Sequence, residues 1–288
     1  MSHAATAAHK PFLLRHACGR APLSYFAILL LPLLASGCGT EIYEQRLAKT
    51  EKLFEYHDLL NQNLQGVWAQ PRFGLSMRIP IGFQLLPAPP EPKVLEDGSV
   101  EVVEDTRHPS FLGIELPGLV DAWQIADVGS LYVCTNHTRF YEQPKEGEDA
   151  KAPEDFFKDL EATLQEGLKF TLSAEEAKTP GELNAKIQEK IPPAAIDDNE
   201  FAPSKDFATI DIGPGEIKDV PPLTGHLYEI QSGDIQTAIV LIYLKSAPSD
   251  PNRPVRLALE TLQVSSQLPK PPANGESKGG GGDSTINF

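Results

Sequence analysis

The sequence predicts an α+β fold in which helices cover a mostly antiparallel sheet and a long amphipathic helix precedes it. Short apolar segments separated by Gly and Pro recur within residues 77–137 and 207–244, as expected for strands. Residues 41–67 and 153–168 instead carry apolar side chains at three- and four-residue steps, as amphipathic helices do. The hydrophobic content of 41% is typical of globular proteins, so a buried core is expected.

The first 37 residues have the composition of a secretory signal peptide. Lys10, Arg15 and Arg20 are the charged residues of this segment, and an apolar run of 15 residues follows from Ala21 to Ala35. A membrane-spanning helix needs about 20 apolar residues, so this run is too short for a permanent span. We therefore expect a leader that is removed from the mature protein.

The leader ends at Ala35-Ser36-Gly37-Cys38, where small residues precede a cysteine. This stretch resembles the lipobox of bacterial lipoproteins, although Ala35 stands where leucine is usual. The resemblance implies cleavage between Gly37 and Cys38, a diacylglycerol thioether on Cys38 and acylation of the new amino terminus. Two or three acyl chains anchor a protein stably, whereas one chain holds it weakly. A plain secreted protein and an uncleaved signal anchor are the alternatives.

The location implied by this resemblance is the cell envelope. The body would be lipid-anchored through Cys38 to the bilayer of a bacterial membrane and would face the periplasm or the exterior. Without residues 1–37 the formal net charge changes from −15 to −18, because the leader carries basic residues and no acidic one. Phosphates are repelled by so acidic a chain, which disfavours DNA and RNA as partners. Basic proteins or divalent cations are compatible with it, although most of these charges simply keep the surface solvated.

A long amphipathic helix is predicted at residues 41–67. Apolar residues recur along one stripe, and charged or amide residues fill the other face. At 1.5 Å per residue such a helix would be about 40 Å long, enough to lift a domain clear of lipid headgroups. It could equally fold back onto the domain or self-associate with another copy. The stripe consists of Leu53, Tyr56, Leu60, Leu64 and Val67, and Tyr43, Leu47 and Phe54 extend it upstream.

The remaining elements follow from local patterns. Alternation at Met77, Ile79 and Ile81 predicts a strand, and the clearest hairpin signal spans His226 to Leu244, with turn residues at 232–234. The second arm of this hairpin is apolar enough to be buried on both faces. Further strands are predicted at 111–118, 120–127, 130–137 and 207–213, and helices at 153–168, at 180–190 and from 252 to 262, where Asn252 is the expected cap.

These segments divide the chain into four parts. They are a signal peptide at 1–37, a lipid anchor with the amphipathic helix at 38–69, an α+β domain at 70–268 and a disordered tail at 269–288. The tail is rich in Gly, Pro and Ser, a composition that cannot bury enough apolar surface to fold.

The domain resembles the PsbP-like superfamily, which includes DcrB-like bacterial lipoproteins. The resemblance covers about residues 70–268 and depends on four pieces of sequence, which are patterns rather than motifs. It implies a helix-covered antiparallel sheet that serves as a binding and assembly scaffold, and it transfers no catalytic residue. The pieces are RIPIGF at 78–83, the helix from Pro153, the 226–244 hairpin and VRLALETLQV at 255–264.

No motif in the chain has the spacing of a catalytic signature. Ser76 in GLSMR lacks the second glycine of a nucleophile elbow. Cys134 and His137 have a C-x-x-H spacing, but zinc needs three or four ligands and no second pair accompanies them, so no metal or other cofactor is predicted. A buried core cysteine is the expected role of Cys134. Trp68 and Trp123 could line a binding surface, with packing inside the core as the alternative.

The preferred hypothesis is a membrane-tethered, non-enzymatic lipoprotein whose acidic α+β domain binds or helps to assemble another envelope or secreted protein. The alternative is a tethered hydrolase or small-ligand-binding protein with a cleft beside the sheet. A third interpretation is a structural spacer whose helix at 41–67 self-associates.

Overall fold

The computed structural model describes residues 40–90, 93, 103–141, 151–193, 201–215 and 217–267. The chain falls into two units, Met1–Glu55 and Tyr56–Phe288. The predicted signal peptide, Cys38, residues 94–102 and the predicted tail at 269–288 lie outside the described residues. Among the residues that are described, no helix is both long enough and apolar enough to cross a membrane.

The predicted α+β class is confirmed. The long helix α2 (Thr40–Asn63) is followed by β1 (Leu64–Gln70), β2 (Leu75–Pro80), β3 (Gln84–Leu85), β4 (Leu119–Ile125) and β5 (Gly129–Thr135). The remaining elements are α3 (Phe156–Leu168), β6 (Lys186–Ile191), β7 (Lys205–Ile212), β8 (Leu223–Ser232), β9 (Ile235–Leu244), α4 (Asn252–Glu260) and β10 (Gln263–Val264). Short 3₁₀ turns lie at Pro71–Phe73, Ser110–Leu112, His137–Phe140 and Pro153–Asp155.

The strands in the described ranges form two sheets. The larger has seven strands in the order β3-β4-β5-β9-β8-β7-β6, and every neighbouring pair is antiparallel. The smaller has the order β1-β2-β10 and is antiparallel as well. Strand β9 lies at the centre of the larger sheet, and eight of its ten residues are buried, as the sequence predicts for the second arm of the hairpin.

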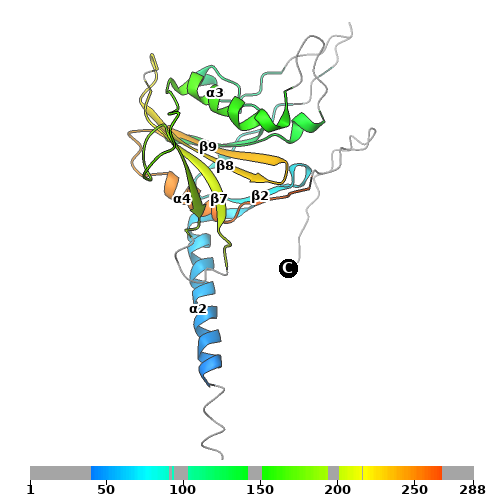
Figure 1. Ribbon diagram of the computed structural model, residues 1–288, viewed down its shortest axis with the longest axis vertical. Coiled ribbons are helices and arrows are strands. Elements are labelled where there is room, and N and C mark those ends of the chain that lie inside the picture. Colours follow the sequence, from blue (N-terminus) through cyan, green and yellow to red (C-terminus); the bar gives the residue numbers. More distant parts are fainter. Residues whose placement is uncertain are drawn as a thin grey trace, which may run out of the picture. The chain divides into compact units, whose positions relative to one another are not determined.

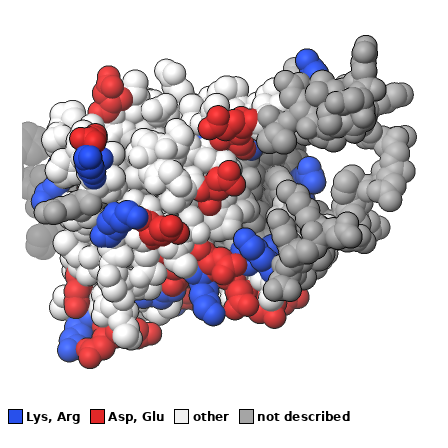
Figure 2. Space-filling model, turned by 90° about the horizontal axis from the view of Figure 1, so that it is seen from above, with Lys and Arg blue, Asp and Glu red and all other residues white. Residues whose placement is uncertain are grey.

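The larger sheet is covered on both faces (Figure 1). Helix α3 packs on one face through Phe156, Leu160, Leu164 and Leu168, each at most 2% exposed. The small sheet, α4 and the end of α2 cover the other face, where Leu60 and Leu64 join the core. Full burial of one such side chain stabilises the fold by about 1.5–3 kcal/mol. Seen from the α3 side, acidic and basic side chains are interspersed over an otherwise uncharged surface (Figure 2).

The hairpin of β8 and β9 closes as the turn residues predict. Ser232 pairs with Ile235, so the loop has two residues, and Gly233 at its first position has a φ of +61°. Such two-residue loops require a positive φ because their twist must match that of the strands, and glycine adopts it without steric cost.

Four predicted elements are corrected by the structure. The helix predicted to reach residue 67 ends at Asn63, because residues 64–70 pair with β2 instead. The helix predicted at 180–190 is absent, and β6 occupies its end because pairing with β7 overrides helix propensity. The strand predicted at 111–118 is a 3₁₀ turn followed by irregular chain. The cap of α4 is Pro251 rather than Asn252, whose side chain points to the sheet.

Candidate functional site

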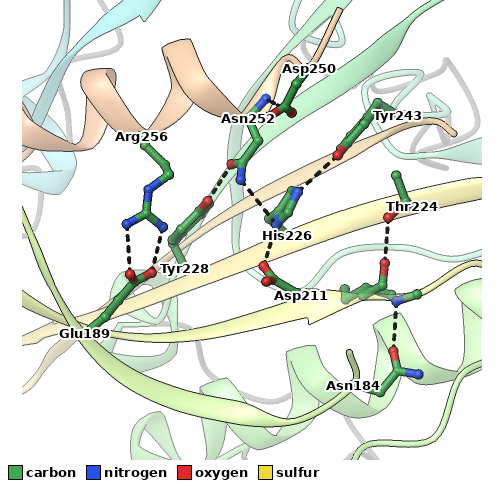
Figure 3. Close-up of polar contacts among 12 residues, drawn as sticks. Asn184, Glu189, Asp211, Thr224, His226, Tyr228, Tyr243, Asp250, Asn252 and Arg256 are labelled. Atoms are coloured by element: carbon green, nitrogen blue, oxygen red, sulfur yellow. Dashed lines mark hydrogen bonds and ion pairs between the residues drawn. The ribbon is translucent and has the colours of Figure 1, made fainter. Parts of the chain in front are cut away.

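A cluster of polar side chains joins the first turn of α4 to strands β7, β8 and β9 (Figure 3). His226 of β8 lies opposite Asp211 of β7, and its Nδ1 is 2.6 Å from Asp211 Oδ1. On the other side, its Nε2 is 3.1 Å from the hydroxyl of Tyr243, and the two rings stack with centroids 5.8 Å apart. Both ring nitrogens of His226 therefore have a side-chain partner.

The chemistry of this arrangement follows from its partners. A carboxylate accepts hydrogen bonds only, so Nδ1 donates to Asp211, and in the tautomer that carries its single proton on Nδ1 the other nitrogen, Nε2, accepts from Tyr243. In a hydrolytic triad this second nitrogen would accept from a nucleophilic hydroxyl. Burial, followed by the negative charges of Asp250 and Asp211, raises the pKa of Tyr243, so this phenol holds its proton near neutral pH. The geometry orders the histidine without activating a nucleophile.

The rest of the cluster attaches α4 to the sheet. The Asn252 side chain accepts from the Tyr228 hydroxyl at 2.5 Å, and its amide nitrogen lies 3.4 Å from His226 Nδ1. Burial raises the pKa of Tyr228. One turn further along, Arg256 donates two hydrogen bonds of 2.8 Å to the Glu189 carboxylate of β6 (Figure 3). Such a bidentate pair fixes orientation as well as distance, so α4 is held in one register on the sheet.

A second charged group lies beneath α3. Glu229 of β8 has a side chain that is 2% exposed, and its Oε2 accepts from Lys186 at 2.9 Å. The same ammonium contacts Glu161 of α3. Burial raises the pKa of Glu229 to about 7, against the opposing charge of Lys186. The other carboxylate oxygen of Glu229 is buried and has no hydrogen-bond partner among the residues that the structure describes.

A shallow hollow of about 350 Å³ opens at the end of the large sheet where β4 turns into β5. Its apolar lining includes Phe111, which is 48% exposed. The two charged residues in the lining are both aspartates, Asp127 and Asp219, and both are exposed. The further residues of the lining are Gln124, Ile125, Val128, Gly129, Ser130, Val220, Pro221, Leu223, Ile242, Tyr243 and Leu244.

The two tryptophans singled out by the sequence are brought together. Their rings meet edge to face, with centroids 5.1 Å apart, and Trp123 is 3% exposed. Trp68 is partly exposed, and its Nε1 donates to Asp121 Oδ2 at 2.9 Å. Packing and a hydrogen bond thus account for both rings, and of the two only Trp68 reaches solvent.

Cys134 and His137, the pair with C-x-x-H spacing, have different neighbours in the fold. Cys134 is fully buried among the residues under α3, where burial raises the pKa of its thiol. His137 instead packs edge to face against Phe73, with ring centroids 5.2 Å apart. Within the part of the chain that the structure describes, no group of three or more His, Cys, Asp or Glu side chains could hold a metal ion. Cys38 lies outside that part.

The His226 cluster, Glu229 and the hollow were not predicted from the sequence. Glu229 carries a signal that could have found it, because it occupies an inward position of an alternating apolar strand. The contact between His226 and Asp211 depends on the register of β7 against β8. A ten-residue connection joins these strands, and a loop of that length does not determine their register.

Comparisons with known proteins give only faint structural similarities. No family model matches the chain, and no curated protein matches it by sequence. A crystal structure of a protein from Bacteroides thetaiotaomicron VPI-5482 aligns with a TM-score of 0.34 and 11% identity, over 69% of this chain and 48% of that one. The chain thus spans about half the length of that protein. The solution structure of cyanobacterial PsbP (CyanoP) from Synechocystis sp. PCC 6803 aligns with a TM-score of 0.31 and 11% identity, over 70% and 93% of the two chains.

Proposed function

We propose that this chain is a lipid-anchored, non-enzymatic lipoprotein of a bacterial cell envelope whose α+β body binds another envelope or secreted protein. The hollow at the β4–β5 end of the large sheet is the observation that carries the binding role. Its lining is mostly apolar, and both of its charged residues are acidic. A partner segment that presents an apolar side chain beside a Lys or Arg would match it in both respects.

The His226 cluster supports a binding role over catalysis. Both ring nitrogens are engaged by side chains, and the Tyr243 phenol has a raised pKa. These contacts join β8 to β7 and β9 and leave the ring no nitrogen free for a substrate. A general base must come within hydrogen-bond distance of the proton that it removes. For His226 this would require the cluster to open.

The anchor is supported by the sequence around Cys38. Mass spectrometry of the protein isolated from bacterial membranes should find a chain that begins at Cys38 and carries added acyl mass. A Cys38→Ala variant should keep its leader and carry no acyl chain. An intact leader in the unaltered protein, or a processed start without hydrocarbon, would refute the anchor.

The binding role can be tested with a photocrosslinking residue, p-benzoylphenylalanine, in place of Phe111 in cells. We expect a crosslinked product of discrete mass whose yield falls at high salt and in the Asp127→Asn, Asp219→Asn double variant. Asp234→Asn is the matched control, because this exposed aspartate lies in the hairpin loop at the other end of the strands. Equal yields in the double variant and the control would contradict a charge-matched partner.

The hollow also supports a second function, the binding of a small molecule. Its volume of about 350 Å³ lies at the lower end of the range for small-ligand sites. Native mass spectrometry of the purified protein separates the two functions. A retained low-molecular-weight species that is lost on denaturation would favour the small ligand, whereas a crosslink from residue 111 to a polypeptide favours the protein partner.

A further inference from the structure

The first half of helix α2 carries an apolar stripe that is exposed to solvent. Tyr43, Leu47 and Phe54 are 67%, 56% and 63% exposed. With Thr50 they follow steps of four, three and four residues, the spacing of the two apolar positions in a coiled-coil heptad. The stripe (Tyr43, Leu47, Thr50, Phe54) spans about 16 Å at the rise of an α-helix.

Thr50 is compatible with an apolar seam. Its hydroxyl donates to the main-chain oxygen of Arg46 at 2.8 Å, within its own helix. The hydrogen-bonding need of the hydroxyl is met there, so the threonine methyl is free to contact an apolar neighbour.

These residues form a stripe separate from the one that enters the core of the body. Tyr56, Leu60 and Leu64 belong to the core cluster or pack against it, and their stripe continues upstream through Leu53. Neighbouring residues of a helix point about 100° apart, so Leu53 and Phe54 lie on different faces. The sequence pattern merged two stripes that the structure separates.

We infer that the stripe pairs with the same stripe of a second copy of this chain, with the two helices parallel. Charge complementarity identifies this occupant and its direction. When Leu47 and Phe54 take the first apolar position of the heptad, Arg46 and Glu51 flank the seam on opposite sides. In a parallel pair Arg46 of each copy meets Glu51 of the partner subunit, which gives two attractive contacts by symmetry. In an antiparallel pair the acidic flanks, Glu44, Glu51 and Asp58, would face one another.

The length of the seam suits pairing at a membrane. Two heptads are too few to hold isolated helices together in dilute solution. Confinement on one bilayer raises the effective concentration of the copies. Once two copies are anchored in the same membrane, pairing of their helices is nearly an intramolecular step. This step rests on the proposed anchor at Cys38, which would also place both helices in the same direction.

Disulfide trapping in native membranes tests the pairing. Thr50→Cys places a thiol on the seam, and Lys52→Cys places one on the opposite face of the helix as the matched control. Cys134 is fully buried and does not compete with them. We expect mild oxidation to give a disulfide-linked dimer with Thr50→Cys and little with Lys52→Cys. Equal yields at the two positions, or a mixed product with another protein at position 50, would overturn the inference.

Charge reversal tests the direction of the pair. Added to Thr50→Cys, either Arg46→Glu or Glu51→Arg should lower the dimer yield by roughly fivefold at low salt, because each changes both exposed ion pairs. Both reversals together should restore the yield. A double reversal that stays as low as the single ones would exclude the parallel arrangement.

The outcomes for the pairing and for the anchor can be told apart. An acylated protein that gives no disulfide at position 50 refutes the pairing and leaves the anchor intact. A disulfide at position 50 in a protein that mass spectrometry shows to lack acyl chains supports the pairing and refutes the anchor.

Discussion

The carboxylate of Glu229 and the ammonium of Lys186 form an ion pair 2.9 Å long beneath helix α3, where the Glu229 side chain is 2% exposed. Within the described part of the chain, the second oxygen of Glu229 finds no hydrogen-bond partner. Taking the charged carboxylate of Glu229 out of water costs several kcal/mol. The ion pair with Lys186 offsets only part of that cost, because it satisfies one of the two carboxylate oxygens. The protonated form of Glu229 is therefore favoured in the folded protein more than in the unfolded chain.

Glu229→Gln should remove a pH-dependent loss of stability. Burial raises the pKa of Glu229 from 4.5 to about 7, so between these values the folded state binds more protons than the unfolded state. Stability from this group is complete below about pH 4.5 and is lost as the pH rises through about 7. From pH 5 to 8 the wild-type free energy of unfolding should fall relative to Glu229→Gln by about 1–3 kcal/mol. Urea denaturation across this range measures the difference, and parallel curves would contradict it.

Lys186→Met should be more harmful than Glu229→Gln. Removal of the ammonium leaves Glu229 and Glu161 close together without their shared cation. Breaking a buried pair from one side costs about 3–5 kcal/mol, and partial exposure of Lys186 places the expected loss at about 2–3 kcal/mol. The loss should shrink toward pH 5 as Glu229 takes up a proton. Equal losses at pH 5 and pH 8 would show that the charge of Glu229 does not determine the effect of removing Lys186.

Asp121→Ala should loosen strand β1 and change tryptophan fluorescence. Asp121 accepts from Trp68 Nε1 at 2.9 Å and from Gln70 Nε2 at 2.6 Å, so it ties β1 to β4. We expect a loss of about 1–3 kcal/mol. The emission should shift to longer wavelength, because Trp68 and Trp123 are the only tryptophans in the chain. Asp121→Asn keeps an acceptor oxygen and should change both readouts less; identical effects would contradict this role.

The sequence predicts the fold class because strong local patterns mark several of the helices, strands and turns. The stripe of α3 and the turn at Gly233 determine their elements directly. The end of α2 could not be predicted from the sequence. Leu60 and Leu64 are four residues apart, as on one face of a helix, but the helix ends and strand β1 begins between them. The His226 cluster could not be predicted from the sequence for a different reason. Its members lie on separate strands and on α4, and their contacts are set by strand register and helix docking.

Asn252→Ala should detach the first turn of α4 from the sheet. Its side chain accepts from Tyr228, a residue that is 1% exposed, so removal leaves a buried hydroxyl with fewer partners. We expect a loss of about 1–3 kcal/mol in urea denaturation. Asp250→Ala is the control, because Asp250 is exposed and accepts only from the Asn252 main-chain nitrogen among the contacts shown in Figure 3. A control loss as large as that of Asn252→Ala would place the effect in the helix start rather than in the cluster.

Gly118→Ala and Gly113→Ala separate backbone strain from steric contact at the edge of the core. Both glycines have a positive φ, +62° and +67°. A Cβ on Gly113 would meet nothing within 4 Å, whereas one on Gly118 would lie 2.0 Å from the main-chain oxygen of Thr135. The left-handed backbone alone costs alanine about 1 kcal/mol, which is the loss expected for Gly113→Ala. Gly118→Ala must in addition move β5 against its ladder, so we expect about 3 kcal/mol or more. Guanidinium denaturation of both variants gives the two values. Similar losses would mean that the contact between residues 118 and 135 yields easily, and that β5 is held in place by its pairing with β4 and β9 rather than by this contact.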